Sequence, residues 1–108
     1  MSVPADPIAA LHERFRASFP QKRAELMAAL DAWRAQPDEF AHMAALYLLT
    51  HKLAGSAGAY GFDTLGDLAR RADRLLQPHV CDALAMSPVF VAPIDAAVQN
   101  LCDSIETA

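Results

Sequence analysis

The chain has few positive charges, and they are not clustered. Of its 108 residues, 9 are Lys or Arg against 13 Asp or Glu, which gives a formal net charge of −4 at pH 7. A protein that binds nucleic acid needs clustered Lys and Arg to meet the phosphate backbone, so nucleic acid is excluded as an expected partner. β-branched residues are also scarce while alanine is abundant, and this balance favours helices over strands.

Long apolar runs and cysteines are scarce as well. The longest apolar run, residues 41–49, is interrupted by His42 and is too short to span a bilayer. No charged segment followed by an apolar leader opens the chain, so no secretory signal is expected. Two cysteines, Cys81 and Cys102, are too few for a disulfide framework. We therefore expect a cytoplasmic protein with two reduced thiols and no membrane partner.

Sites for a metal or a nucleotide are lacking too. His12, His42 and His79 show no metal-ligand spacing, and there is no Cys/His cluster. Because neither a glycine-rich nucleotide loop nor a kinase signature occurs, we expect no cofactor of the protein's own and no use of ATP. His42 falls on the apolar side of its segment and is predicted to be a partly buried structural histidine.

What the chain does have is a series of amphipathic helical patterns. Apolar residues at helical spacing predict helices over residues 6–18, from Pro20 to about 35, and from about 37 to 59. Such helices with short connections predict an all-α fold: an antiparallel four-helix bundle, up-down-up-down, with an additional short N-terminal helix that caps its end. The length suits one domain over residues 1–108.

Two further helices complete this pattern. The first is predicted to begin with Asp63 as N-cap, to carry an ion pair between Asp67 and Arg71, and to end at Pro78. The start of the last helix is open, because either Pro88 or Pro93 could be the proline of its first turn.

His51 stands out in the third predicted helix. At about 100° per residue, one apolar stripe on this helix contains Leu46, Leu49, Leu53, Ala57 and Tyr60. His51 projects from the opposite side and should face water. Gly55 and Gly58 follow one and two turns later, although each glycine inside a helix costs about 1 kcal/mol relative to alanine. The glycines indicate clearance for a bulky partner, or else close packing of another helix of the same domain, above all at Gly58.

The segment around His51 resembles the histidine-containing phosphotransfer (Hpt) domain of bacterial two-component phosphorelays. That family's motif is histidine, any residue, leucine, usually lysine, then glycine, with a second glycine a few residues later. The matching residues are His51, Leu53, Gly55 and Gly61. Ala54 occupies the usual lysine position, while Lys52 lies about 100° around the helix from His51. The resemblance extends from about residue 11 to 105, and its C-terminal part matches only as a helix pattern.

The resemblance implies that His51, on the second helix of the bundle, is the phosphoacceptor, through its Nε2 atom. The protein would be a phosphocarrier without ATP-dependent kinase activity. Its implied partners are response-regulator receiver domains, which hold the Mg²⁺ and the receiving aspartate, and a hybrid sensor kinase. It is expected to be a monomer. An alternative, favoured by Ala54, is a non-catalytic module that docks on a receiver or kinase and inhibits signalling. A third reading is a dimerisation fragment of a sensor kinase, in which an acidic residue usually takes the place of Lys52.

Residues around His51 are assigned to the partner and to the phosphate. Because an apolar patch around an exposed polar residue suits a protein interface, the predicted docking residues are Tyr47, Leu48, Gly55 and Gly58. Tyr47 could instead be half buried. Lys52 is the candidate to neutralise phosphate charge, with a merely solvated lysine as the alternative. The sequence leaves open which residue, if any, of a charged helix face also approaches the phosphate: Arg70, Arg71 or Arg74.

Overall fold

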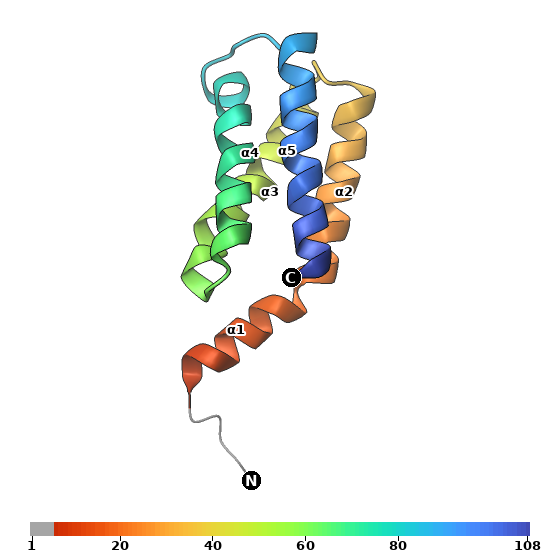
Figure 1. The fold of residues 1–108 in the computed structure, drawn as a ribbon. Coiled ribbons are helices and arrows are strands. Elements are labelled where there is room, and N and C mark those ends of the chain that lie inside the picture. The colour runs from red at the N-terminus through yellow and green to blue at the C-terminus, as the bar shows by residue number, and fades with distance from the viewer. Residues whose placement is uncertain (1–5) are drawn as a thin grey trace.

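The computed structural model describes residues 6–108, and four of its helices form a bundle (Figure 1). The elements are α1 (Pro7–Ala17), α2 (Phe19–Ala35), α3 (Phe40–Ser56), a short 3₁₀ helix η1 (Gly58–Tyr60), α4 (Asp63–Cys81) and α5 (Pro88–Thr107). Helices α2 to α5 form a ring in which each packs against two neighbours, and the described residues contain no strand. The predicted all-α bundle with an extra N-terminal helix is confirmed. The single domain predicted over residues 1–108 stays a prediction, and its first five residues lie outside the described part.

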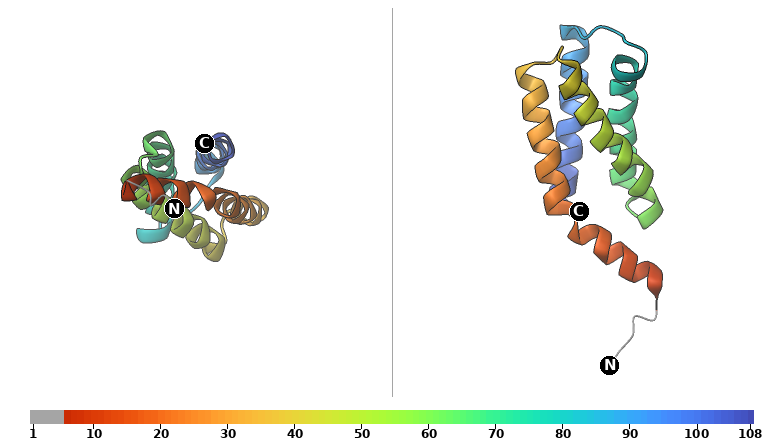
Figure 2. Two further views of the ribbon diagram at one scale, coloured as in Figure 1. Left: turned by 90° about the horizontal axis from the view of Figure 1, so that it is seen from below. Right: turned by 180° about the vertical axis from the view of Figure 1, so that it is seen from behind.

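Helix α1 crosses beneath one end of the bundle, as Figure 2 shows from below. It contacts α2 and η1, and the ring of its His12 stacks on Phe62, just after η1, with centroids 4.2 Å apart. Gly61 lies directly under α1 with a φ of 90°, a left-handed conformation in which a side chain would be strained. A Cβ atom at Gly61 would also meet the His12 ring at 3.4 Å. The predicted capping position of the first helix is therefore confirmed, and Gly61 ends the short helix η1.

The core lies between the four bundle helices. Its largest fully buried side chains include Trp33, Leu30, Leu46, Leu76 and Leu101. In the predicted stripe of α3, Leu46, Leu53 and Ala57 are buried and Leu49 is half buried, so the face assigned to the core is correct. His42 is half buried, as predicted, and its Nε2 atom lies 3.2 Å from Oε1 of Gln36. Cys102 is buried and Cys81 exposed, and no disulfide joins them.

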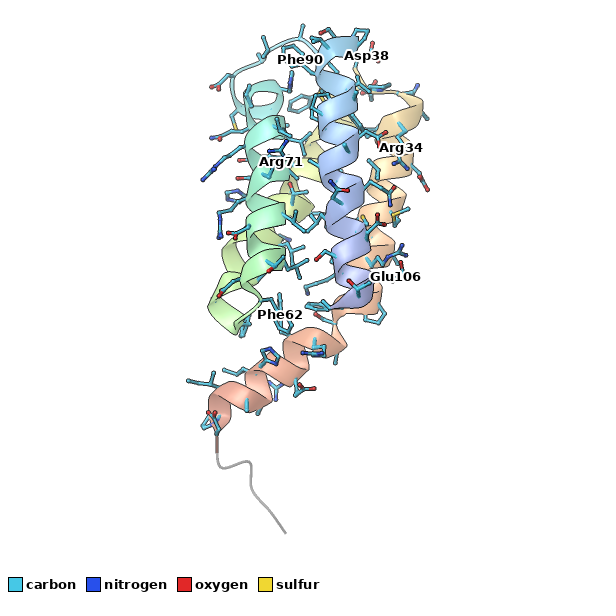
Figure 3. The ribbon with its side chains drawn as sticks, in the orientation of Figure 1. Arg34, Asp38, Phe62, Arg71, Phe90 and Glu106 are labelled. Atoms are coloured by element: carbon cyan, nitrogen blue, oxygen red, sulfur yellow. The ribbon has the colours of Figure 1, made fainter. Side chains whose placement is uncertain are left out.

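Polar contacts close the ring between α2 and α5. Arg34, labelled in Figure 3, donates hydrogen bonds of 2.9 and 2.7 Å to the two carboxylate oxygens of Asp95. These bonds lower the pKa of the Asp95 carboxyl from its ordinary value. Arg23 donates to the carbonyl of Cys102 at 3.2 Å and to Glu106 at 3.3 Å. The end of α5 is thus held beside the start of α2.

Helix α3 ends earlier than its periodicity predicts. It stops at residue 56, and residues 58–60 tighten into η1. The amide of Phe62 donates to the carbonyl of Ala57 at 2.8 Å, which closes the turn in place of a further α-helical bond. Tyr60 consequently leaves the helical stripe, although its ring still stacks on Phe15 with centroids 4.8 Å apart.

Both predicted ends of α4 are wrong. Phe62 occupies the N-cap position and its carbonyl accepts the first helical bond, from Gly66 at 2.9 Å, so Asp63 is already the first helical residue. Pro78 lies inside the helix, which continues to Cys81. Proline removes its own amide donor and its ring crowds the carbonyl four residues earlier, but the residues after Pro78 still donate to carbonyls one turn earlier, as Asp82 does to Pro78 at 3.2 Å.

The predicted ion pair between Asp67 and Arg71 is also wrong. Asp67 pairs with Arg70 instead. Side chains on a helix lean toward its N-terminus, and Gly66 leaves room for the guanidinium, which would lie 3.6 Å from a Cβ atom at that glycine.

The open choice for the start of α5 is resolved in favour of Pro88, while Pro93 lies inside the helix.

Candidate functional site

His51 lies in the C-terminal half of α3, and its side chain is 61% exposed. Leu53, two residues later on the same helix, is 3% exposed. The opposition between an exposed histidine and a buried leucine stripe follows from the 3.6-residue helical repeat. The predicted orientation of His51 toward water is confirmed.

A carboxylate on α4 holds the imidazole, and the sequence reasoning did not find it. Nδ1 of His51 lies 3.0 Å from Oδ1 of Asp73, whose side chain is only 16% exposed. A carboxylate can only accept, so this contact places a proton on Nδ1 and leaves the Nε2 lone pair of the neutral ring free. One signal was present in the sequence. Asp73 lies at the edge of the apolar face of α4, next to Ala72 and one turn before Leu76.

Tyr47 covers one side of the imidazole. Its ring stacks on that of His51 with centroids 5.4 Å apart and an interplanar angle of 27°. The Sγ atom of Cys81 lies 3.8 Å from the Tyr47 hydroxyl oxygen. The hydrogen bond between the Tyr47 hydroxyl and Cys81, partial removal from water and the nearby Asp73 carboxylate raise the pKa of the Tyr47 hydroxyl. Tyr47 is half buried, and its hydroxyl is neutral at neutral pH. The neighbouring Leu48 is 52% exposed.

The two glycines after His51 have different surroundings. A Cβ atom built at Gly55 would meet nothing within 4 Å, so the surface one turn from His51 is open. At Gly58 the guanidinium of Arg70 would lie 3.9 Å away, and a Cβ atom at Gly66 of α4 would come within 3.2 Å of the Gly58 amide nitrogen. Close packing within the domain, the alternative kept open for Gly58, is present there, whereas clearance at Gly55 is compatible with a docking role.

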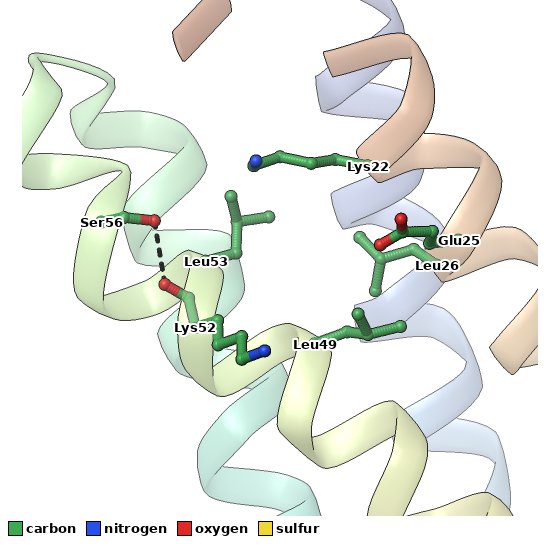
Figure 4. A pocket seen from close by; sticks show the side chains of 7 residues that line it. All are labelled: Lys22, Glu25, Leu26, Leu49, Lys52, Leu53 and Ser56. Carbon is green, nitrogen blue, oxygen red and sulfur yellow. Dashed lines mark hydrogen bonds between the residues drawn. The ribbon is translucent and has the colours of Figure 1, made fainter. Parts of the chain in front are cut away.

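Lys52 lies on the other side of α3 from Asp73. It lines a groove of about 260 Å³ between α2 and α3 together with Lys22, Glu25, Leu26, Leu49, Leu53 and Ser56. Figure 4 shows the Lys52 side chain turned toward α2, across the leucines that form the groove floor. The assignment of Lys52 to the phosphate environment stays a prediction, and its cation lies on the α2 side of the helix.

Three arginines follow the outer surface of α4. They line a shallow depression together with Asp67 and Leu75. Arg71 and Arg74 are exposed, and Arg70 lies one turn before Asp73. Arg70 also reaches Gly58 and pairs with Asp67, so it is the arginine placed beside the end of α3. Arg71, labelled in Figure 3 on α4, is exposed.

Within residues 6–108, no group of three His, Cys, Asp or Glu side chains is arranged to hold a metal ion. Among the helices that the structure describes, none has both the length and the apolar character needed to cross a membrane.

The fold and site define a helical bundle that presents a histidine to solvent and orients it through a neighbouring carboxylate. The family model of the Hpt domain matches residues 10–108, nearly the whole chain, and the chain therefore belongs to the Hpt domain family. No curated protein matches this chain. Hpt domains are phosphocarriers of phosphorelays, lack kinase activity, and interact with receiver domains and kinases.

Proposed function

We propose that this protein is an active phosphocarrier that takes a phosphoryl group onto His51 from one receiver aspartate and passes it to another. The observation that carries the proposal is the 3.0 Å contact between Nδ1 of His51 and Asp73 on a histidine that is 61% exposed. The largely buried carboxylate fixes one ring nitrogen of His51 and directs the other toward solvent, which is the arrangement that a nucleophilic histidine requires.

The chemistry follows from this tautomer. Nε2 attacks the phosphorus of an aspartyl phosphate in line with the bond that breaks, and that bond's electron pair leaves with the aspartate oxygen. The new N–P bond puts positive charge on the imidazole ring, and the Asp73 carboxylate stabilises that charge through the Nδ1 proton. Hand-over to the next receiver is the reverse step. Mg²⁺ bound by the receiver would neutralise phosphate charge, while this chain supplies the nucleophile and its orientation.

The partner surface would surround the open strip beside His51. Gly55 leaves room for a receiver domain, and the exposed Leu48 offers apolar contact next to the half-buried Tyr47. Gly58 borders this strip. Receiver domains and a hybrid sensor kinase are the partners we propose for a monomeric, cytoplasmic protein.

Charge near the phosphate would come from both sides of α3. Lys52 is one candidate, from the α2 side. Arg70 is the candidate on the α4 side, one turn from Asp73, where it would make up for the alanine at position 54.

The test is phosphate transfer from a phosphorylated receiver to the wild type and to His51→Gln. We expect acid-labile phosphate on the wild type and none on His51→Gln. The variant's free energy of unfolding should change by no more than about 0.5 kcal/mol, as for other exposed substitutions. His42→Gln, the same substitution on the same helix away from Asp73, is the matched control and should accept phosphate normally.

Two results would contradict the proposal. Normal transfer by His51→Gln would show that another residue is the acceptor. A wild-type protein that binds its receiver and inhibits it without accepting phosphate would establish the non-catalytic docking module instead.

A further inference from the structure

The stacking of Tyr47 on His51 joins neighbours on one helix. Tyr47 lies one turn before His51 on α3, and residues four apart share a helix surface. Their centroid separation of 5.4 Å is within the range of favourable ring pairs. Such pairs attract one another beyond the effect of the area they bury. The imidazole is thus restrained on one face although most of its surface is exposed.

Tyr47 is itself held in place by α4 and by the core. Its ring packs against the buried cluster of the bundle, and its hydroxyl oxygen lies 3.8 Å from Sγ of Cys81 near the end of α4. The raised pKa of this hydroxyl keeps it a neutral hydrogen-bonding group at neutral pH. Cys81 and Asp73 belong to the same helix, so α4 reaches His51 by two routes: directly at Nδ1, and through Tyr47 at the ring face.

The two contacts constrain different motions. The hydrogen bond to Asp73 fixes one atom of the imidazole but leaves the ring able to tilt about that atom. The last torsion of a histidine side chain is broad, so the rotamer alone does not set the ring plane. Contact with the flat face of Tyr47 does set the plane. Together the two contacts determine the direction of the Nε2 lone pair.

We propose that Tyr47 is a positioning residue for phosphotransfer, which fixes the imidazole plane of His51 so that Nε2 points at the incoming phosphorus. The inference rests on the proposed function of His51. It gives Tyr47 a role inside the reaction in addition to the docking role that the sequence indicates. The rate of in-line attack depends on the direction of the Nε2 lone pair, because misplacement of a reacting group by 1 Å can cost roughly 10²-fold in rate.

The experiment compares Tyr47→Leu, which keeps apolar bulk, with Tyr47→Phe, which keeps the flat ring. Two phosphoryl donors are used, the small molecule phosphoramidate and a phosphorylated receiver. For Tyr47→Leu we expect the rate to fall with both donors by about tenfold, well within the cost of a 1 Å misplacement. Tyr47→Phe loses only the 3.8 Å contact with Cys81 and keeps the ring packed against the core, so it should react at close to the wild-type rate with both donors. Tyr60→Leu, the same change at the half-buried tyrosine beside Phe15, is the matched control and should react at the wild-type rate.

An NMR measurement distinguishes a change in the orientation of the imidazole from a general loss of structure. In the wild type, the ring protons of His51 should carry a ring-current shift from Tyr47 in NMR spectra. Tyr47→Leu should lose that shift and Tyr47→Phe should keep it, while the Nδ1–H tautomer persists in both. Tyr47→Gln, another good helix former, takes the place of Tyr47→Leu if the leucine variant does not fold.

The outcomes distinguish the inference from the function on which it rests. A wild-type rate with phosphoramidate in Tyr47→Leu, together with slow transfer from the receiver, would leave Tyr47 a docking residue only and overturn the inference. Unchanged ring shifts in Tyr47→Leu would overturn it as well. If neither donor phosphorylates the wild type, the proposed function fails, and the ring shifts still decide whether Tyr47 orients the imidazole.

Discussion

The two sides of α3 are built for different tasks. Toward α4, His51 is bonded to Asp73 and covered by Tyr47, so polar contacts orient an exposed side chain. Toward α2, an open groove has a floor of leucines, including Leu53, and carries Lys52 at its edge. One helix can separate chemistry from stability in this way because neighbouring residues are about 100° apart around its axis and meet different partners.

Close approach on the α4 side explains part of the difference. Gly58 and Gly66 face one another where α3 gives way to η1, and a Cβ atom at Gly66 would come within 3.2 Å of the opposing backbone. Small residues let helix backbones come near, so a short side chain such as Asp73 can span from α4 to His51. On the α2 side, leucines line a groove between the two helices.

The largest expected effect is on stability, from Leu53→Ala. Leu53 is 3% exposed, and truncation of a buried leucine costs about 2–5 kcal/mol. Denaturant unfolding followed by circular dichroism measures the loss. Leu48→Ala, on the exposed face of the same helix, is the control and should cost no more than about 0.5 kcal/mol. At low temperature, folded Leu53→Ala should still accept phosphate from a small donor. An unchanged unfolding midpoint would mean that the leucine floor does not stabilise the bundle.

Asp73→Ala should do the opposite and slow chemistry while sparing the fold. A hydrogen bond to a charged group contributes about 1.5–3 kcal/mol. Loss of the lower end of that range in the transition state slows phosphorylation by about tenfold. The rate with phosphoramidate and the unfolding free energy are measured in parallel, with Asp63→Ala in the first turn of α4 as control. If Asp73→Ala unfolds the protein but its folded fraction reacts normally, the carboxylate is structural. The α4 side of α3 would then stabilise the fold, as the α2 side does, and would not orient His51.

Gly55→Leu tests whether the open strip beside His51 serves a protein partner. Nothing stands within 4 Å of a Cβ atom at this position, so a side chain fits without strain. Helix propensity should raise stability by up to about 1 kcal/mol. Transfer from a receiver should weaken because the new side chain obstructs docking, while phosphoramidate should still modify His51. Gly55→Ala, with a far smaller side chain, should bind the receiver nearly normally. Normal receiver transfer by Gly55→Leu would remove the docking role.

The smallest expected effect distinguishes the two candidate cations. Two unit charges 4 Å apart interact by about 1 kcal/mol in water, and solvent screening reduces this further at greater distance. Arg70→Gln should therefore slow receiver transfer by roughly two- to threefold, since about half that energy corresponds to such a factor. Lys52→Gln should change it less, because its side chain is turned toward α2. The reverse order would show that the phosphoryl group is approached from the groove side.

The order and number of helices, the core face of α3 and the exposure of His51 follow from the amino-acid sequence. Each of these features depends on the periodicity within one segment, because an amphipathic helix turns its apolar stripe toward the core whatever the arrangement of the other helices. The motif from His51 to Gly61 is equally local. The stop predicted at Pro78 was wrong, because the residues after this proline continue the helical hydrogen bonds to Cys81 although the proline itself donates none.

The contacts that orient His51 were decided by tertiary structure. Asp73 is 22 residues from His51, and Cys81 is 34 residues from Tyr47. Periodicity places each of these side chains around its own helix axis, but it does not state how α4 is rotated, how closely it approaches, or which residues lie at the same height. The same limit applies to Lys52. Helical periodicity gives its angle from His51 around the axis of α3, but it does not show that Lys52 lines a groove against α2. Those quantities depend on the packing of two helices against a shared core.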